Sequence, residues 1–134
     1  MASEAQAART PGAKRAGPGE YVFDLAKVNK IKGGPDYSSV EGGCVEGDRM
    51  IVALMRMPAG TGAEPHSHPN EQWIYVLEGT LLAKVGETGV EARAGSVVYV
   101  PSNVVHSAKA TADADVVFFT VKDASHSLHG TKAA

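Results

Sequence analysis

Hydrophobic residues in this chain occur in short runs and alternating stretches, with a Gly or Pro about every ten residues from Tyr21 onward. Alternation with a period of two places successive side chains on opposite faces of a strand. No helical period is sustained anywhere in the chain. The pattern predicts an all-β fold, with strands over residues 21–25, 38–44, 49–57, 72–77, 80–85, 90–92, 97–100, 104–110 and 115–121 and a hairpin loop over the Gly-Glu-Thr-Gly of residues 86–89.

The stretch 50–55, Met-Ile-Val-Ala-Leu-Met, is apolar on both faces. A strand with one face in solvent alternates instead. Either the N-terminal segment of the same chain covers the second face, or a second copy of the chain packs against it. We expect the second arrangement, a homodimer.

Residues 1–19 contain mainly Ala, Gly, Pro, Arg and Lys and have no apolar periodicity. Such a composition is typical of a segment that buries too little apolar surface to fold. We therefore expect a disordered arm over residues 1–19, one β domain over residues 20–124, and a tail over residues 125–134. A chain of 134 residues is long enough for one domain to bury its own core.

Charge and composition exclude several classes of function. The chain has 13 Lys and Arg against 15 Asp and Glu and no basic stripe, so nothing favours a nucleic-acid partner. Apolar runs such as residues 97–100 and 116–121 are far too short to span a bilayer. The single cysteine, Cys44, excludes an internal disulfide and fits a reducing compartment. We expect a cytoplasmic protein that binds a small molecule.

Three histidines and a glutamine have the spacing of a metal site. His66 and His68 are one residue apart, so on an extended segment both imidazoles leave the same face. Gln72 returns to that face if the period of two continues, whereas Glu71 does so only through a bulge. His106 follows another strand-like run. Paired imidazoles gain little as packing but are good ligands for first-row divalent ions.

The predicted site therefore holds one divalent transition metal ion, bound by His66, His68, Gln72 and His106. Iron, nickel, manganese, copper and zinc all suit these ligands. One alternative stays open, in which Gln72 only contacts a bound water and the ion has three histidine ligands. His126 and His129, in the Gly-containing tail, are expected to be ordinary surface residues.

Two blocks of the sequence resemble the motifs of the cupin superfamily. The first motif, Gly-x5-His-x-His-x3-Glu-x6-Gly, is matched by Gly60, His66, His68 and Gly79, with Gln72 in the Glu position. The second motif, Gly-x5-Pro-x-Gly-x2-His-x3-Asn, is matched by Gly95, Pro101 and His106, with Asn103 and Ala110 in the Gly and Asn positions. The resemblance implies a jelly-roll β-barrel and a metal site built from the motif histidines.

Two cupin groups share parts of this site. The cupins that open unsaturated uronates in pectin degradation are similar in the stretch His-x-His-Pro-x-Glu-Gln, which implies Gln72 as a ligand. The three-histidine iron dioxygenases that cleave β-diketones are similar in their ligands and in an apolar cavity, which implies iron as the expected metal. A non-catalytic module that binds a small molecule is the third alternative.

Three neutral imidazoles and a neutral amide leave the full charge on a divalent ion, which favours an anionic ligand such as an enolate. Strand parity places Ile74 and Val76 toward the cavity. Arg56 and Tyr99 are the candidate catalytic residues that would add a charge or a hydroxyl beside the metal. We therefore expect a metal-dependent enzyme for a small enolisable carbonyl compound, with dioxygenase chemistry ahead of isomerisation or ring opening.

Overall fold

The strands form where the sequence alternates between inward and outward residues. In the computed structural model, which describes residues 7–133, the strand Gln72–Glu78 (β6) buries Gln72, Ile74 and Val76 and exposes the residues between them. The strand Val97–Val100 (β9) alternates in the same way. Each of these strands thus turns one face to the interior and the other to solvent.

The larger sheet has seven strands, in the order β1-β3-β4-β11-β6-β9 with β2 paired to β3. Only the β1–β3 pair is parallel, and the other pairs are antiparallel. Besides β6 and β9, the sheet contains β1 (Lys14–Arg15), β2 (Ile31–Lys32), β3 (Glu41–Glu46), β4 (Met50–Met57) and β11 (Val116–Asp123).

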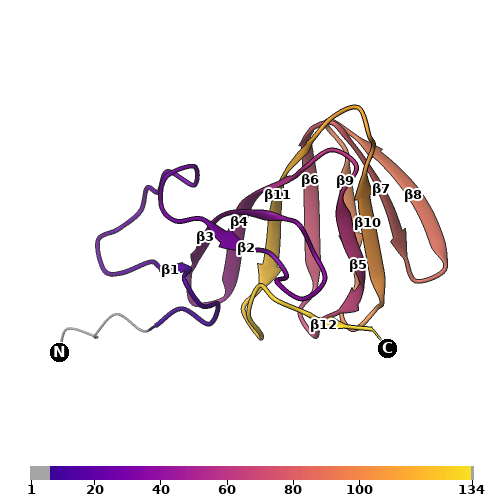
Figure 1. The fold of residues 1–134 in the computed structure, drawn as a ribbon. Helices are drawn as coiled ribbons and strands as arrows, with labels where there is room; N and C mark the ends of the chain where they lie inside the picture. The colour runs from indigo at the N-terminus through magenta and orange to yellow at the C-terminus, as the bar shows by residue number, and fades with distance from the viewer. Residues whose placement is uncertain (1–6, 134) are drawn as a thin grey trace.

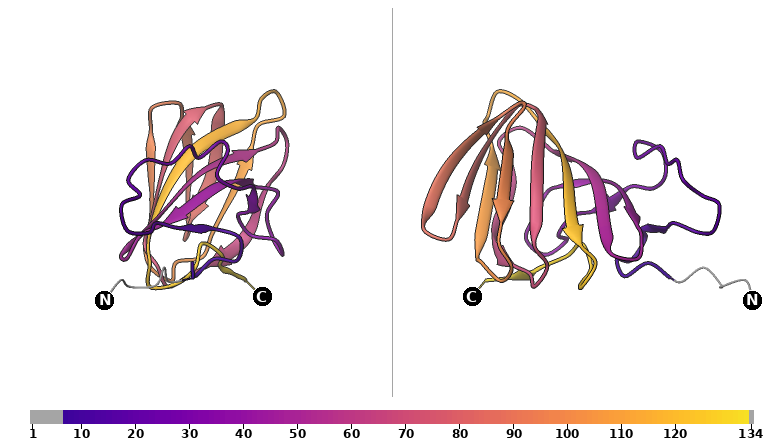
Figure 2. Two further views of the ribbon diagram at one scale, coloured as in Figure 1. Left: turned by 90° about the vertical axis from the view of Figure 1, so that its left-hand side faces the viewer. Right: turned by 180° about the vertical axis from the view of Figure 1, so that it is seen from behind.

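The smaller sheet has five antiparallel strands, in the order β12-β5-β10-β7-β8. They are β5 (Gly62–Ser67), β7 (Thr80–Val85), β8 (Thr88–Arg93), β10 (His106–Ala110) and β12 (Thr131–Lys132). The two sheets curve around a common interior, as the views in Figures 1 and 2 show. Residues from both sheets form one hydrophobic core, for example Met55 and Val76 from the larger sheet and Leu81 and Ala110 from the smaller one. The prediction of an all-β jelly-roll is confirmed.

A tight turn joins β6 to β7 and depends on Gly79. This glycine has a φ of 80°, and a Cβ atom on it would lie 2.3 Å from the carbonyl oxygen of Asp115. Only glycine combines a left-handed backbone with so close an approach of another chain segment. The turn therefore fixes the position where β6 leaves the large sheet and β7 enters the small one.

Most predicted strands are present, and two of them, residues 80–85 and 97–100, have the predicted bounds. The strand predicted over residues 21–25 is wrong, because Tyr21 and Val22 are exposed and pair with no other strand. The prediction also omitted β5 from its strands, although it treated the segment around His66 as extended. It missed β1, β2 and β12 as well, which have two residues each and are too short to produce a periodic pattern.

The N-terminal segment contacts the barrel. β1 pairs with β3, and the backbone N–H groups of Arg9 and Thr10 donate to the buried carboxylate of Glu46 over 2.6 and 2.9 Å. The hydroxyl oxygen of Thr10, itself buried, accepts a hydrogen bond of 2.7 Å from the N–H of Leu128. The structure thus places residues 7–19 against the barrel through polar backbone contacts rather than an apolar face, where the sequence led us to expect a disordered arm. Residues 1–6 lie outside the described residues.

The C-terminal tail also joins the barrel. β12 pairs with β5, and Leu128 packs into the hydrophobic core. Contacts with the barrel thus reach beyond the expected boundaries of residues 20 and 124 on both sides.

The outer face of β4 is partly covered by its own chain. Leu25 and Leu54 line the same surface hollow, and a Cβ atom on Gly43 of β3 would meet the carbonyl oxygen of Leu25 at 1.8 Å. The segment around Leu25 therefore lies directly against β3 and β4. This contact supports the first explanation of the apolar stretch 50–55, in which the N-terminal segment covers it.

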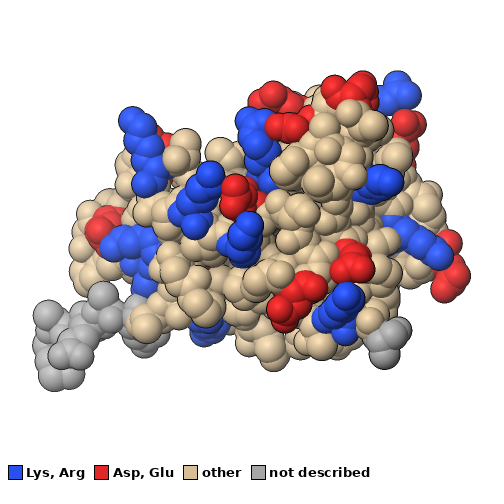
Figure 3. All heavy atoms as spheres, in the orientation of Figure 1, with Lys and Arg blue, Asp and Glu red and all other residues tan. Residues whose placement is uncertain are grey.

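Positive and negative side chains are interspersed on the face drawn in Figure 3, and neither sign dominates it. Within residues 7–133, no helix is long and apolar enough to cross a membrane.

Candidate metal centre

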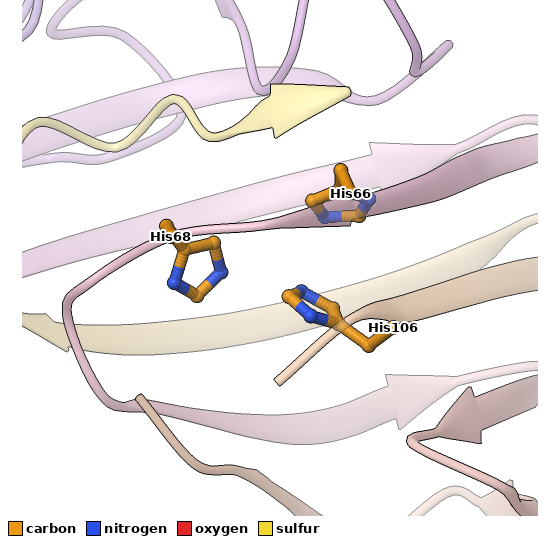
Figure 4. A group of neighbouring side chains, drawn as sticks. All are labelled: His66, His68 and His106. Atoms are coloured by element: carbon orange, nitrogen blue, oxygen red, sulfur yellow. The ribbon is translucent and has the colours of Figure 1, made fainter. Parts of the chain in front are cut away.

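Three histidines converge inside the barrel from two neighbouring strands (Figure 4). His66 lies on β5, His68 follows the end of that strand, and His106 begins β10 as the direct partner of His66. The ring centroids of His66 and His106 are 4.1 Å apart, and those of His68 and His106 are 4.8 Å apart. One ring nitrogen of each histidine lies within 4.8 Å of the others. This spacing is small enough for a single ion to contact all three.

The backbone fixes the orientation of each imidazole. Nδ1 of His66 lies 2.6 Å from the carbonyl oxygen of Glu64, Nδ1 of His68 lies 2.8 Å from that of Asn70, and Nδ1 of His106 lies 2.9 Å from that of Val104. A carbonyl oxygen can only accept, so each Nδ1 must carry the hydrogen. Each Nε2 therefore keeps a free lone pair, which is the arrangement that metal-binding histidines use.

The environment keeps these rings neutral. Burial first, and then the neighbouring His106 ring, lower the pKa of His66 to about 3. Burial and next the ammonium of Lys122 lower the pKa of His68 to about 4. Burial also lowers the pKa of His106. At neutral pH all three imidazoles are deprotonated, as metal binding requires.

A short relay orients Gln72 on β6. The hydroxyl of Thr120 donates to the carbonyl oxygen of Trp73 over 2.9 Å, so its oxygen accepts from the amide nitrogen of Gln72 over 2.8 Å. The amide oxygen of Gln72 then points at Nε2 of His68, 3.1 Å away. Because that nitrogen carries a lone pair, two acceptors face each other.

Two facing acceptors repel unless a cation lies beside them. In addition, Nε2 of His106 is buried and has no hydrogen-bond partner within residues 7–133. Buried polar atoms without a partner are rare and need an explanation. A divalent ion bound by the three Nε2 atoms and by the amide oxygen of Gln72 would give all of these atoms a partner at once. The residues present therefore fit the expected metal.

A mostly apolar cavity opens beside the histidines. Ile74 faces it as predicted, together with Met55, Met57 and Phe118, while Val76 is buried in the core. The sequence left open which face of β11 points inward. Phe118 lines the cavity, so the inward face is the one with residues 116, 118 and 120.

A family model described as "Cupin domain" matches residues 53–122, which is more than half of the chain. The chain belongs to the cupin family. No curated protein matches it. The fold and the buried histidine cluster agree with this assignment.

Solved structures resemble this cupin in fold. A cupin-2 domain protein from Rhodospirillum rubrum has 20% identity and a TM-score of 0.67, covering 85% of this chain and 79% of the other. KdgF from Halomonas has 17% identity and a TM-score of 0.61, covering 70% and 85%. The polyketide cyclase RemF from Streptomyces resistomycificus has 23% identity and a TM-score of 0.53. This cupin spans 55% of the RemF chain, and the match covers 57% of its own.

The two candidate catalytic residues lie on the other face of the large sheet. Arg56 is exposed on β4 and forms an ion pair of 2.8 Å with Asp115. The hydroxyl of Tyr99 donates to the carboxylate of Glu71 over 2.6 Å, and its ring packs on Trp73. Strand parity explains both positions, because the neighbours of Arg56 and Tyr99 face inward. The structure does not bring Arg56, Tyr99 or Glu71 together with the histidines of this cupin.

Three residues at the cavity were missing from the sequence interpretation. The ring of Tyr37 stacks on His66 with centroids 4.1 Å apart, and Thr120 orients Gln72. Lys122 is buried on β11 and lines the same cavity. Thr120 and Lys122 continue the inward period of Phe118, so only the undecided phase of this strand concealed them. Tyr37 precedes β3 in a loop and has no periodic signal.

Proposed function

We propose that this cupin is a metal-dependent enzyme that acts on a small enolisable carbonyl compound. The first candidate reaction is oxygen-dependent cleavage with a single iron ion. The observation that carries the proposal is the ligand set, three imidazoles held neutral and an amide oxygen. A divalent ion held by neutral ligands keeps its full charge and supplies a Lewis acid for an enolate.

The residues of the chain itself supply the surroundings for such a reaction. The carbonyl oxygens of Glu64, Asn70 and Val104 hold the three rings in place, so little reorganisation is needed when charge develops. The apolar wall that includes Ile74 and Phe118 limits water beside the site. Both features support chemistry on a charged intermediate that water would otherwise quench.

A second candidate is a metal-dependent isomerase or ring-opening enzyme. The orientation of Gln72 favours it, because the amide oxygen faces the histidines, as the resemblance to the uronate-opening cupins implies. The two candidates differ in whether dioxygen is consumed.

Metal analysis and oxygen uptake test the proposal. Protein purified without chelator is expected to contain about one equivalent of transition metal, and the variant His106→Ala is expected to lose most of it while staying folded. His129→Ala, which changes a histidine outside the cluster, is the matched control. Wild-type protein without stoichiometric metal would leave only the non-catalytic binding module.

Oxygen consumption is then measured with small β-diketones and keto acids. Uptake that matches substrate loss supports the dioxygenase. Full turnover under anaerobic conditions eliminates it in favour of the second candidate.

A further inference from the structure

Lys122 is a buried amine in the wall of the metal cavity, and burial lowers its pKa to about 7. It lies on β11 as the direct partner of Gln72 on β6, and its side chain lines the cavity that also contains His66 and His106. Residues paired in this way place their side chains on the same face of the sheet, with Cβ atoms about 5 Å apart. Only 4% of its surface is exposed.

No acidic group stabilises the charged form of this amine. Within residues 7–133, no carboxylate oxygen lies within 4.0 Å of its nitrogen, whose only hydrogen bond goes to the carbonyl oxygen of Leu128. The nearby thiol of Cys44 is neutral, because burial raises its pKa to about 12. Glu46, also close to Cys44, accepts the N–H groups of Arg9 and Thr10 instead.

A buried charge is normally paired. An ammonium can donate three hydrogen bonds, and the protein accepts one of them. The unpaired donors border a cavity whose other walls are mainly apolar, including Val40, Met55 and Phe118. An anion that enters the cavity would supply the missing acceptors and stabilise the charged form of Lys122.

We propose that Lys122 binds the carboxylate of the substrate, so that the substrate is an enolisable dicarbonyl acid rather than a neutral diketone. This inference rests on the proposed function, because the histidine cluster is taken to hold the enolisable end of the same molecule. The cavity then recognises two features at once, a chelating enolate and a carboxylate, with a short apolar body between the walls.

A matched pair of ligands tests the carboxylate contact. 2,4-Dioxopentanoate and pentane-2,4-dione share the β-dicarbonyl group and differ in a carboxylate against a methyl group. Calorimetric titration of each into zinc-loaded protein measures binding without any turnover. We expect wild type to prefer the acid by more than tenfold. Lys122→Met and Lys122→Gln are expected to bind the acid about 30-fold more weakly and the diketone within about threefold of wild type.

Met55→Leu changes the same cavity without touching the charge and is the control; it is expected to keep the preference for the acid. Thermal denaturation confirms that each variant is folded. Unchanged binding of the acid by both Lys122 variants, or an equal loss for both ligands, would overturn the proposal.

The same titrations with metal-free protein separate this inference from the proposed function. If zinc fails to bind wild type, the metal-dependent function fails, whereas a preference for the acid that disappears in Lys122→Met still supports the carboxylate contact. If neither the metal-free nor the zinc-loaded wild type prefers the acid to the diketone, the carboxylate contact of Lys122 is excluded.

Discussion

Substitutions of Gln72 test whether the metal site has four ligands or only the three histidines. If its amide oxygen is a ligand, Gln72→Leu should weaken metal affinity by about tenfold or more, because an apolar side chain cannot coordinate. Gln72→Glu should keep the metal or bind it more tightly, since a carboxylate offsets one unit of its charge. Metal titration of the three proteins at one pH measures the difference. Equal affinity across wild type, Glu and Leu would show that the site has only histidine ligands.

The histidine cluster also predicts how stability depends on pH. The folded pKa values of His66 and His68, about 3 and 4, lie below the unfolded value near 6.5. Between these values the unfolded chain binds protons that the folded protein does not, so stability of the metal-free protein falls as pH decreases from about 6.5 to 4.

We expect a loss of roughly 1 kcal/mol per pH unit for each buried histidine in that window. Urea denaturation of metal-free protein at pH 7.5 and pH 5 measures it. His66→Gln should reduce the slope, and His126→Gln, at an exposed position, should not. A stability that is flat over this range would contradict the burial of neutral imidazoles.

At the scale of elements, the N-terminal segment is expected to stabilise the barrel. Truncation of residues 1–19 removes β1 and leaves the buried carboxylate of Glu46 without its two N–H donors. An unsatisfied buried acceptor costs about 1–3 kcal/mol, and more when it is charged. Urea denaturation should show at least this loss, whereas truncation of residues 1–6 removes none of these contacts. Equal stability of the two truncations would refute a structural role for the segment.

The sequence predicts what depends on strand period and motif spacing. The spacing of His66, His68 and His106 was enough to predict the histidine cluster, and the period of β6 was enough to predict that Gln72 faces inward. Arg56 and Tyr99 were placed at the site although their own strand parity directs them outward. Lys122 was missed because the doubly apolar pattern of β11 leaves its phase open. The contacts of Thr10 with Glu46 and Leu128 join distant residues through backbone groups, which no local pattern records.

For the whole molecule, the homodimer remains a prediction, and the structure offers a surface for it. The outward residues of β6 and β9, on the larger sheet, are large and exposed, namely Trp73, Tyr75, Leu77, Val97 and Tyr99. A contiguous apolar patch of this kind is typical of an interaction surface. We expect a second copy of the chain to cover it.

Light scattering coupled to size exclusion measures the mass in solution. Trp73→Glu is expected to shift a dimer to monomer, because a charge would be buried at the centre of the contact. Leu82→Glu, at an exposed position on β7 of the other sheet, is the control and should remain dimeric. A wild type that is monomeric at high concentration would refute the dimer.

The position of β11 has a consequence for how the chain reaches its native state. This strand lies between β4 and β6 in the large sheet, yet the ribosome makes it long after both. Until β11 emerges, β4 and β6 each present an unpaired edge, and such edges recruit other strands. Pairing that must wait for distant residues is also slow. At low temperature fewer chains are made per unit time, so the unpaired edges of different unfinished chains meet less often. Synthesis at low temperature should therefore raise the soluble yield of this protein.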